Sequence, residues 1–516
     1  MPHRSVRRRP AALLTAALAV GLSAPVALAG TAATSPQPSG RAAGPAAPTV
    51  AVRPQLGHRG PFLTDSTGRV VILHGVNAVF KRPPYVAPAT AAGFTARDAD
   101  FLVRHGINAV RLGVLFAGVM PRPGVIDQGY LDRIDRIVQL LADRRIWVLL
   151  DFHQDALNER FAGEGFPAWA THDDGLPFVD LGSFFLNDQT PAVQRAYDHF
   201  WNDDNDLWRY YTQAWVAVAK KWRDQPYLMG YDLFNEPNAG SQMSTCANPA
   251  GCPVFDARLQ AMFDHVRAAI RAVDPRNLVW FEPQFLFNAI SRSNFTHVDD
   301  PAVALSWHDY ACTPAFVEGG VFPDDVDCTI NEPRVMDDAA QQMEQMGAGG
   351  AMTEFGAEDD LADLERMTAY ADQHLTGWMY WAYKHWDDPT GSDTEGLFRD
   401  DAKPATVKQA KVDVLFHAYP QAIAGTPTRM RWSPARELMT LTFRPDPSTG
   451  LTDVFVPARA YPGGYSVRVA GGHVARSSGD HVLIAADRGS RRVRVLVQPR
   501  GRVLGCVAAL HGSCRG

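Results

Sequence analysis

The sequence predicts an α/β fold, a (β/α)8 TIM barrel followed by a small C-terminal antiparallel β-sandwich. Eight short apolar runs rich in β-branched residues alternate with segments in which apolar residues recur at helical spacing. Nearly all of these runs end in a polar or aromatic residue, as parallel strands do when their carboxyl ends form one functional face. Shorter alternating runs, separated by proline and glycine, follow the eighth run and indicate the sandwich.

The predicted barrel has about forty residues per unit, enough for one strand, one helix and the loops that join them. Two of the intervening segments show helical spacing most clearly. Their apolar residues are Ile134, Ile137, Val138 and Leu141 in one segment, and Tyr211, Trp215, Val218 and Trp222 in the other. The eight predicted strands are residues 70–76, 109–114, 147–152, 230–234, 278–281, 302–307, 351–353 and 377–381.

A second domain follows the barrel. The last barrel helix is predicted at residues 405–417, and residues 420–427 are interpreted as a break because they combine proline with small residues. We therefore place the barrel at residues 54–420 and the sandwich at residues 426–500. The predicted sandwich strands are residues 438–443, 452–456, 465–469, 481–484 and 492–497.

The N-terminus has the pattern of a signal peptide at residues 1–29. A cluster of arginines precedes an Ala-rich apolar run, and residues 27–29 (Ala-Leu-Ala) form a small-x-small cleavage site. A membrane anchor is the alternative, but proline interrupts the run and its length is barely enough to span a bilayer. Residues 30–53 contain too few large apolar side chains to form a core and are predicted to be a disordered linker. We therefore expect a secreted protein, and the paired arginines also suit a twin-arginine exporter.

The six cysteines fall into three near-neighbour pairs. Export to an oxidising compartment would allow each pair to form a disulfide. Metal ligation is the alternative, but no Cys-x-x-Cys motif or suitably spaced histidine supports it. The predicted disulfides are Cys246–Cys252, Cys312–Cys328 and, in the tail of residues 501–516, Cys506–Cys514.

Charge gives no indication of a nucleic-acid partner. The formal net charge of -6 is small for 516 residues, and the basic residues are dispersed after the N-terminus. We expect a monomer that does not bind DNA or RNA.

Two carboxylates at predicted strand ends suggest the chemistry. Glu236 closes the fourth strand and Glu354 closes the seventh, so they face each other across the barrel mouth. Such a pair suits hydrolysis of a glycosidic bond, in which one group protonates the leaving oxygen and the other attacks the anomeric carbon, without a metal or a cofactor. Glu282, at the end of the fifth strand, is the alternative carboxylate. A solvated glutamate at a loop start is the alternative interpretation of Glu236.

Polar and aromatic residues near the other strand ends fit a sugar site. Asn235 can bond the sugar 2-hydroxyl, and Trp381 offers a flat apolar face to a pyranose ring. Tyr310 and Arg111 can orient Glu354 and hold it ionised, because a donor hydrogen and a nearby cation favour the carboxylate. Any one of these histidines or tyrosines, taken singly, could instead be a hydrogen-bonded residue of the core that does not contact substrate. The predicted substrate-binding residues are Lys81, Arg111, His153, Asp155, Asn235, Glu282, Gln284, His308, Tyr310 and Trp381.

Four motifs mark the strand ends: DFHQD at residues 151–155, YDLFNEP at 231–237, TEFG at 353–356 and WMYWAYKHWDD at 378–388. Together they resemble glycoside hydrolase family 5 and, within it, the endoglycoceramidase group, which also carries a C-terminal β-sandwich. The resemblance implies a retaining β-glycosidase that cleaves between the glycan and the ceramide of glycosphingolipids, with Glu236 as acid/base and Glu354 as nucleophile. The loop at residues 79–84 resembles the galactosylceramide-directed members.

A long aromatic segment follows the third strand, at residues 161–186, and exceeds the usual length of a βα loop. We expect it either to line a groove for an acyl chain or a membrane surface, or to pack its aromatic residues against one another. The predicted partner is thus a glycolipid or a β-glycan, with transient contact to a membrane surface. An endo-β-glucanase is the alternative function, and a carbohydrate-binding barrel without turnover is an alternative of another class. The aromatic residues are Phe161, Phe166, Trp169, Phe178, Phe184 and Phe185.

Overall fold

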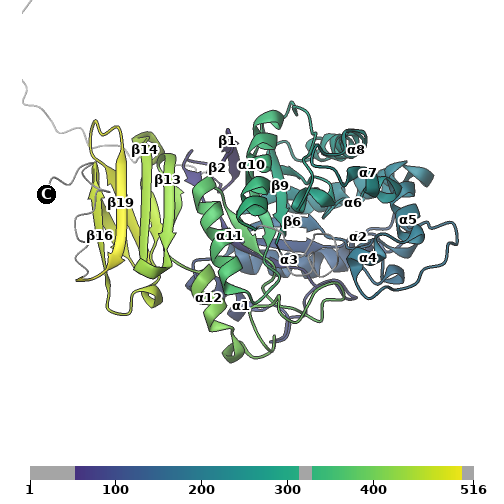
Figure 1. The fold of residues 1–516 in the computed structure, drawn as a ribbon, viewed down its shortest axis with the longest axis horizontal. Helices are drawn as coiled ribbons and strands as arrows, with labels where there is room; N and C mark the ends of the chain where they lie inside the picture. Colours follow the sequence, from purple (N-terminus) through teal and green to yellow (C-terminus); the bar gives the residue numbers. More distant parts are fainter. Residues whose placement is uncertain (1–52, 313–327, 502–516) are drawn as a thin grey trace, which may run out of the picture. The chain divides into compact units, whose positions relative to one another are not determined.

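The computed structural model describes residues 53–312 and 328–501, and its centre is a closed barrel of eight parallel strands (Figure 1). The strands are β4 (His74–Ala78), β5 (Ala109–Val114), β6 (Trp147–Phe152), β7 (Leu228–Asp232), β8 (Val279–Phe281), β9 (Val303–Asp309), β10 (Gly349–Phe355) and β11 (Trp378–Tyr380). They close in the order β10-β11-β4-β5-β6-β7-β8-β9, and every neighbouring pair is parallel. All eight carboxyl ends therefore lie at one mouth. The predicted fold class is confirmed.

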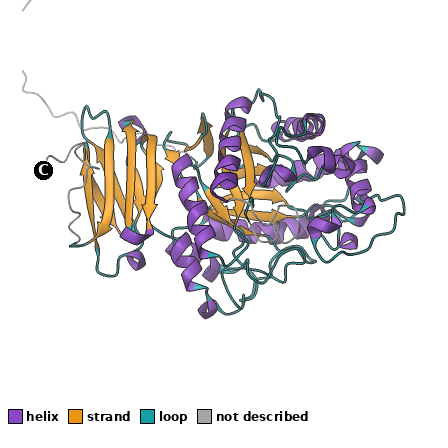
Figure 2. Cartoon of the chain, viewed as in Figure 1, coloured by secondary structure: helices purple, strands orange, loops and turns teal. Residues whose placement is uncertain are grey.

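Helices surround the barrel strands (Figure 2). They are α1 (Ala96–Arg104), α2 (Phe116–Val119), α3 (Gln128–Ala142), α4 (Phe184–Asn187), α5 (Pro191–Trp201), α6 (Leu207–Trp222), α7 (Met243–Cys246), α8 (Pro253–Arg271), α10 (Cys328–Met346), α11 (Leu361–His374) and α12 (Gln409–Leu415). The residues predicted at helical spacing lie in α3 and α6, and all of them are buried. Their apolar faces therefore pack onto the barrel, as an amphipathic helix requires. Short 3-10 helices lie at Glu159–Phe161, Ala168–Ala170, Asp204–Asp206, Gly240–Gln242, Phe285–Asn288, Pro404–Thr406, Pro434–Arg436, Pro447–Thr449 and Ala458–Ala460.

The predicted first strand, residues 70–76, is wrong because the chain changes sheets within it. β3 (Val70–Val71) pairs with β12 (Tyr419–Ile423) outside the barrel, and the N–H of Ile72 donates to the carbonyl of Gln421 at 3.2 Å. The barrel strand β4 begins only at His74. A continuous β-branched run predicts extended structure, but it cannot show which of two sheets each residue joins.

The sandwich consists of two sheets, and the larger one takes strands from both sides of the barrel sequence. The remaining strands are β1 (Leu56–Arg59), β2 (Phe62–Asp65), β13 (Gly425–Ser433), β14 (Leu438–Pro445), β15 (Thr452–Phe455), β16 (Tyr465–Ala470), β17 (Gly472–Ser478), β18 (His481–Ala486) and β19 (Val493–Pro499). The seven-stranded sheet has the order β1-β2-β3-β12-β15-β18-β17, and the four-stranded sheet has the order β13-β14-β19-β16. Strands β1 to β3 therefore join a sheet of the sandwich, while Leu56 of β1 and Leu63 of β2 pack with barrel residues. The domain boundaries at residues 54 and 420 stay a prediction.

The predicted break at residues 420–427 is also wrong, because β12 and β13 pass through it. Pro420 precedes a register shift in β12, and Pro427 stands next to a bulge in β13. A proline at such an irregular position is compatible with a strand, since its missing N–H is not needed for a regular ladder. β17 was not predicted either, because its residues are almost all exposed and show no alternation.

Two of the predicted disulfides are confirmed, Cys246–Cys252 and Cys312–Cys328. Cys506 and Cys514, the predicted signal peptide and nearly all of the predicted linker lie outside the described residues. Within residues 53–312 and 328–501, no helix has both the length and the apolar character needed to cross a membrane.

Candidate active site

A cavity of about 510 Å³ opens at the carboxyl ends of the barrel strands and contains both predicted catalytic carboxylates. Loops that follow the third, seventh and eighth barrel strands complete its walls. Besides those two glutamates, it is lined by Lys81, His153, Asp155, Ala162, Asp180, Gly182, Ser183, Phe184, Asn187, Asn235, Tyr310, Ala357, Glu358, Trp381, Pro389, Thr390, Gly391, Ser392, Thr394 and Glu395.

Glu236 and Glu354 face each other across this cavity. A carboxylate oxygen of each lies within 4.8 Å of the other, and Nδ1 of His308 lies 2.9 Å from Glu236 and 3.5 Å from Glu354. Glu236 follows β7 with a left-handed backbone, φ 44°, and β10 has a register shift between Met352 and Glu354. Both irregularities turn a side chain away from the regular strand direction, as is common beside active sites. The predicted pairing is thus present in the fold.

Glu354 is held by a cation and a hydroxyl. The guanidinium of Arg111 contacts Oε1, and the hydroxyl of Tyr310 donates to Oε2 at 2.9 Å. Burial raises the pKa of Glu354 to about 7, while the charge of Arg111 opposes that shift. Arg111 and Tyr310 therefore do contact and orient Glu354, as predicted.

Glu236 lies in a different environment. Its Oε1 accepts a hydrogen bond from the Nδ2 of Asn288 at 2.7 Å, and its backbone N–H donates to Glu282 at 2.8 Å. Burial first, and then the negative charge of Glu354, raise the pKa of Glu236 well above its ordinary value. The raised pKa favours the protonated form of Glu236. Asn288, which ends a 3-10 helix after β8, was not predicted because nothing in the sequence marks that position.

Arg111 links the carboxylates below the cavity floor. It is fully buried, and it lies 2.9 Å from Asp232 and 3.0 Å from Asp151. It also donates to Oδ1 of Asn235 at 2.9 Å. Asp151 and Asp232 were not predicted as site residues, although a charged residue inside an apolar strand is a usable signal, since a buried charge needs a partner.

One end of the cavity is a polar corner, formed by Lys81, His153, Asp155, Trp381 and Thr390. Lys81 lies 2.6 Å from Asp155 and 2.6 Å from the hydroxyl of Thr390, with its ammonium 4.6 Å from the centre of the Trp381 ring. The His153 ring stacks on Trp381 at 5.1 Å, and its Nε2 has no hydrogen-bond partner in the described part of the chain. This corner offers several donors and acceptors beside the Trp381 side chain, which suits a sugar ring. Thr390 was not predicted.

The predicted substrate-binding residues divide into two groups. Lys81, His153, Asp155, Asn235, Tyr310 and Trp381 line the cavity, whereas Arg111, Glu282, Gln284 and His308 do not. Those four side chains are fully buried, and their assignment as substrate-binding residues stays a prediction.

Glu282 and Gln284 instead accept hydrogen bonds from nearby backbone N–H groups. The Glu282 carboxylate accepts the backbone N–H of Glu236 and lies 3.3 Å from Arg111. The side chain of Gln284 caps the 3-10 helix that follows, accepting the N–H of Leu286 at 2.9 Å. Glu282 therefore cannot replace Glu236 or Glu354 as the catalytic carboxylate, because it does not reach the cavity.

The aromatic segment after β6 mostly packs against other side chains, and one of its aromatic residues lines the cavity. Its first part packs inward: Phe161 and Phe166 are buried, and Trp169 donates its indole N–H to the carbonyl of Met120. Its later part, from Leu176 to Leu186, forms one rim of the cavity, where Phe184 lines the wall. Val179 and Leu181 in this part are 67% and 51% exposed. We call residues 176–186 the apolar rim.

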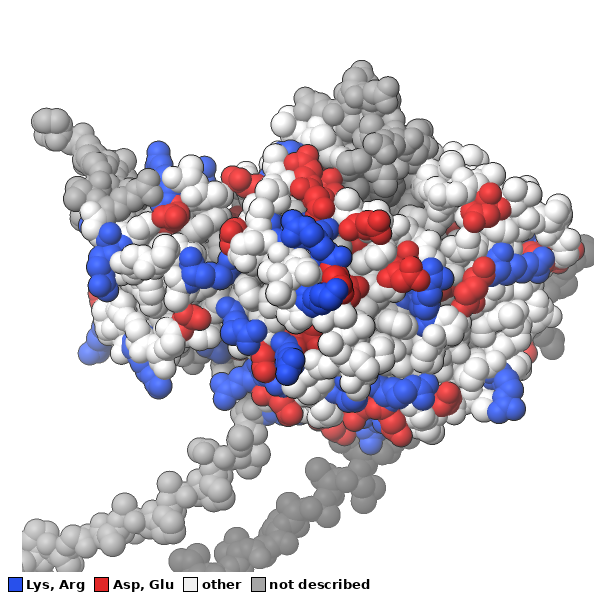
Figure 3. Space-filling view, turned by 90° about the horizontal axis from the view of Figure 1, so that it is seen from below, with Lys and Arg blue, Asp and Glu red and all other residues white. Residues whose placement is uncertain are grey.

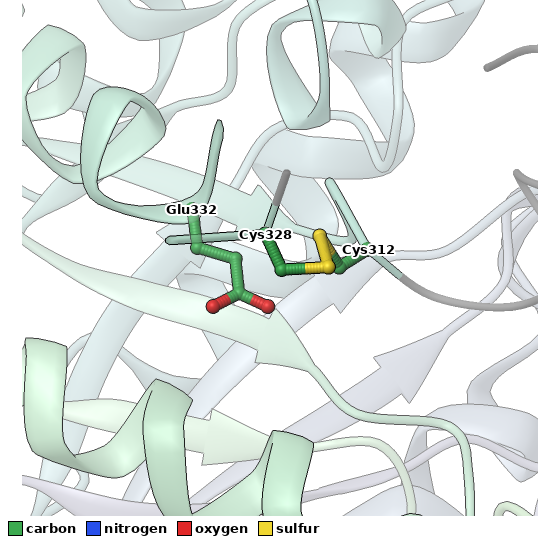
Figure 4. Close-up of side chains that lie close together, drawn as sticks. All are labelled: Cys312, Cys328 and Glu332. Carbon is green, nitrogen blue, oxygen red and sulfur yellow. A yellow bond between two sulfur atoms is a disulfide. The ribbon is translucent and has the colours of Figure 1, made fainter. Parts of the chain in front are cut away.

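Three groups of side chains in the described part of the chain bring potential metal ligands together. Cys312 and Cys328 are joined in a disulfide beside Glu332, so their sulfurs are not available as thiolates (Figure 4). The second group is His153, Asp155 and Glu164. The ammonium of Lys81 already lies 2.6 Å from the carboxylate of Asp155 and 3.8 Å from that of Glu164. The third group is Glu236, His308 and Glu354, the catalytic pair with its bridging histidine.

Two family models match the chain. The model described as cellulase (glycosyl hydrolase family 5) matches residues 65–387, and the glycoside hydrolase family 5 C-terminal domain matches residues 418–497.

The chain is also similar to characterised proteins over most of its length. Endoglycoceramidase I of Rhodococcus hoagii (strain 103S) is 34% identical over 451 residues, which are 86% of this chain and 88% of that protein. Endo-glycoceramidase II from Rhodococcus sp., solved as a five-membered iminocyclitol complex, has a TM-score of 0.73 and 30% identity, covering 85% of this chain and all of that one. That enzyme has also been solved as a ganglioside GM3 complex and as a lactosyl-enzyme intermediate. An endogalactoceramidase structure, at 23% identity and a TM-score of 0.64, shares the fold over 86% of this chain and all of that one.

Proposed function

The chain belongs to glycosyl hydrolase family 5, and from this premise we propose that it cleaves the β-glycosidic bond between the glycan and the ceramide of glycosphingolipids. It is a retaining glycoside hydrolase. The observation that carries the proposed substrate is the cavity itself, which is lined by the paired carboxylates, by the polar corner and by part of the apolar rim. The similarity to endoglycoceramidases supports the same substrate class.

The proposed reaction has two steps. Glu354 attacks the anomeric carbon while Glu236 gives its proton to the oxygen that leaves with ceramide, so a glycosyl-enzyme ester forms. Glu236, now a carboxylate, then takes a proton from water, and the resulting attack on the anomeric carbon frees the glycan and restores Glu354. The separation of the two carboxylates, within 4.8 Å between oxygens, fits this double displacement better than an inverting geometry.

The different environments of the two carboxylates support this division of roles. The Arg111 guanidinium and the Tyr310 hydroxyl both favour the ionised form of Glu354, which a nucleophile requires. Glu236, whose pKa is raised by burial and by the charge of Glu354, keeps the proton that an acid must give. The same charge favours reprotonation after each cycle.

The polar corner would hold the sugar next to the scissile bond. Asn235 lies beside the acid, and its Oδ1 is fixed by Arg111, so its amide hydrogens are oriented toward Gln154 and Asp155. Lys81 and Asp155 offer a donor and an acceptor to sugar hydroxyls, and Trp381 offers its ring face. This arrangement supports binding of a sugar ring in one defined orientation, which brings the anomeric carbon to Glu354.

The apolar rim would hold the lipid. From Leu176 to Leu186 the chain has one charged side chain, Asp180, whose carboxylate is already bonded to the N–H of Gly182 and the amide of Asn187. Exposed apolar side chains at the edge of a substrate cavity are consistent with a lipid aglycone and with transient contact to a membrane surface.

Secretion is part of the proposal. The N-terminal sequence has the pattern of a signal peptide. Two disulfides in the folded domain suit an oxidising compartment.

The test is hydrolysis of a panel of substrates with both products identified. Galactosylceramide, glucosylceramide, lactosylceramide and a ganglioside should each be compared with soluble β-glucans, and free glycan and ceramide measured by mass spectrometry. Galactosylceramide is included because of the loop at residues 79–84. Release of intact ceramide with a β-anomeric glycan as the first product is expected.

A second candidate, an endo-β-glucanase, is favoured by the family model described as cellulase. Good activity on soluble glucans with none on any glycolipid would select it. Saturable glycan binding without turnover on any substrate would instead select a carbohydrate-binding barrel.

A further inference from the structure

The formal charges are divided unequally between the two domains. Residues 426–501 carry twelve arginines and five carboxylates, a formal net charge of +7, whereas residues 54–425 carry a formal net charge of -21. The dispersal of basic residues expected from the whole sequence therefore does not hold for the sandwich. In the space-filling view, the sandwich at the left shows more basic than acidic side chains (Figure 3).

One sheet concentrates this charge. The four strands β13, β14, β19 and β16 contain five arginines and no carboxylate. Residues that pair directly across antiparallel strands project from the same side of a sheet, so the registers define one side. One central row across the strands consists of Arg429, Thr442 and Arg494. The other consists of Arg431, Thr440, Leu496 and Arg468.

The other side of this sheet is the sandwich core. Met430, Leu441 and Val495 alternate with the arginine rows and are buried. The side with the arginines is therefore the outer side. Arg444 lies two residues beyond Thr442 on β14 and so projects outward as well.

Four of these arginines, Arg429, Arg431, Arg444 and Arg468, are exposed and define what we call the arginine face. In the described part of the chain, none of their guanidinium groups makes an ion pair or a hydrogen bond, whereas Arg459 of the same domain pairs with Asp413 at 2.7 Å. Arg429 and Arg431 share a cleft with carboxylates of α11, so Arg444 and Arg468 are the more open members. The four guanidinium groups thus make no ion pair in the described residues, and Arg444 and Arg468 do not line the cleft that holds the α11 carboxylates.

We propose that the arginine face docks the protein on bilayers that carry anionic lipid headgroups. A guanidinium pairs with a phosphate through two parallel N–H donors. The hydroxyl of Thr442, between Arg429 and Arg494, supplies a further donor. A barrel with a formal net charge of -21 is repelled by the same surface. Adsorption to an anionic bilayer therefore depends on the sandwich. This surface is separate from the proposed cleavage of glycolipids and requires no turnover.

Nucleic acid is the competing polyanion, and the outer side of the sheet does not suit it. Base binding by a sheet uses exposed aromatic rings. By register, Trp432 pairs with Met439 and Phe443 pairs with Val493, which places both rings on the core side. The arginine face offers charge and hydroxyls without a stacking platform, which favours phosphate headgroups.

The experiment is co-sedimentation of the full chain with vesicles of phosphatidylcholine, with and without phosphatidylglycerol, in the absence of glycolipid. We expect binding only to the anionic vesicles and a loss of binding as salt is added. Because a basic residue near an anionic surface contributes about 1 kcal/mol, each arginine changes affinity about fivefold. The variant Arg431→Ser, Arg444→Ser, Arg468→Ser should therefore bind on the order of a hundredfold more weakly, with unchanged hydrolysis of a soluble aryl β-glycoside.

The matched control removes three exposed arginines from the barrel, Arg97→Ser, Arg104→Ser and Arg122→Ser. It changes the net charge by the same amount and should bind anionic vesicles within about threefold of wild type. Equal weakening of the two variants, equal binding to neutral vesicles, or binding to duplex DNA without binding to vesicles would each overturn the proposal. Since no substrate is present, these outcomes are independent of whether the protein hydrolyses glycolipids.

Discussion

At the scale of single residues, the two catalytic carboxylates are distinguished by their neighbours, and Glu354 is the one paired with a cation. Glu354→Gln should lower kcat on glycosphingolipids by at least about a thousandfold, because it removes the nucleophile. It preserves the shape of the side chain, so affinity for the uncharged glycan product should change only a few-fold. Single-turnover rates and glycan titration measure the two effects. Glu344→Gln, an exposed carboxylate on α10, is the matched control and should retain the wild-type rate. A near-normal kcat in Glu354→Gln would contradict the assignment.

Replacing Glu236 should slow the hydrolysis of each substrate according to how much its leaving group needs protonation. Glu236→Gln should slow ceramide release by about a hundredfold to ten-thousandfold, while an activated aryl glycoside is partly spared. Because burial and the charge of Glu354 raise the pKa of Glu236, wild-type activity should be lost as pH rises through that pKa and the acid ionises. The variant should lack this alkaline limb. The pH profile of kcat/KM on both substrates tests this, and equal slowing of both would remove Glu236 from the acid role.

The sequence predicts the residues that end barrel strands, but it does not show how deep each one lies. Glu236, Glu354 and Trp381 could be placed because the fold brings strand ends to one mouth. His308 also ends a strand, yet it is buried below the cavity, because strand length and bulges set depth. Thr390 comes from a loop, whose path depends on tertiary contacts that local sequence does not encode.

At the scale of elements, the apolar rim should decide whether the substrate is a lipid. Val179→Ser with Leu181→Ser should reduce activity on glycolipids in vesicles by about tenfold or more, because each buried apolar side chain contributes about 1.5 to 3 kcal/mol. Hydrolysis of a soluble aryl glycoside should be unchanged, and so should stability, since both side chains are exposed. Rates on the two substrates provide the comparison.

The control for this loop is Val103→Ser with Val474→Ser, exposed apolar residues that are 41% and 39% accessible and lie outside the rim. This variant should keep both activities. If the rim variant lost both activities equally, the loop would support the cavity rather than bind lipid.

Elements inside the barrel were easier to predict than those of the sandwich. β5 and β6 match the predicted strands residue for residue, because buried parallel strands are continuous apolar runs. β12 and β13 carry proline, and β17 is nearly all exposed, so their strand character comes from pairing partners distant in sequence. Local patterns cannot report such partners.

At the scale of the whole molecule, strand pairing and side-chain contacts connect the sandwich to the barrel. β3, which precedes the barrel, pairs with β12, which follows it. The hydroxyl of Tyr419 on β12 donates to the carbonyl of Gly106 in the barrel at 2.6 Å. His74 at the start of β4 stacks between Trp378 and Tyr419. These contacts predict that the two domains unfold together.

The buried histidines at this junction make stability depend on pH. His417 stacks on Trp432 at 5.0 Å, and burial lowers the pKa of His417 to about 4. Burial also lowers the pKa of His74 well below its ordinary value. In the unfolded chain a histidine titrates near 6.5, so the unfolded state binds more protons below that pH. Each neutral buried histidine therefore contributes its full stability above pH 6.5 and loses it as the pH falls toward the folded pKa.

For His417 this loss should reach about 3 kcal/mol near pH 4. His417→Phe keeps a ring against Trp432 but cannot titrate, so its free energy of unfolding should fall less than that of wild type between neutral pH and pH 4. His473→Gln, whose imidazole is exposed on β17, should follow the wild-type curve. Urea unfolding at a series of pH values measures all three. Parallel curves for wild type and His417→Phe would show that His417 is protonated in the folded protein, and the junction would then owe its acid sensitivity to carboxylates instead.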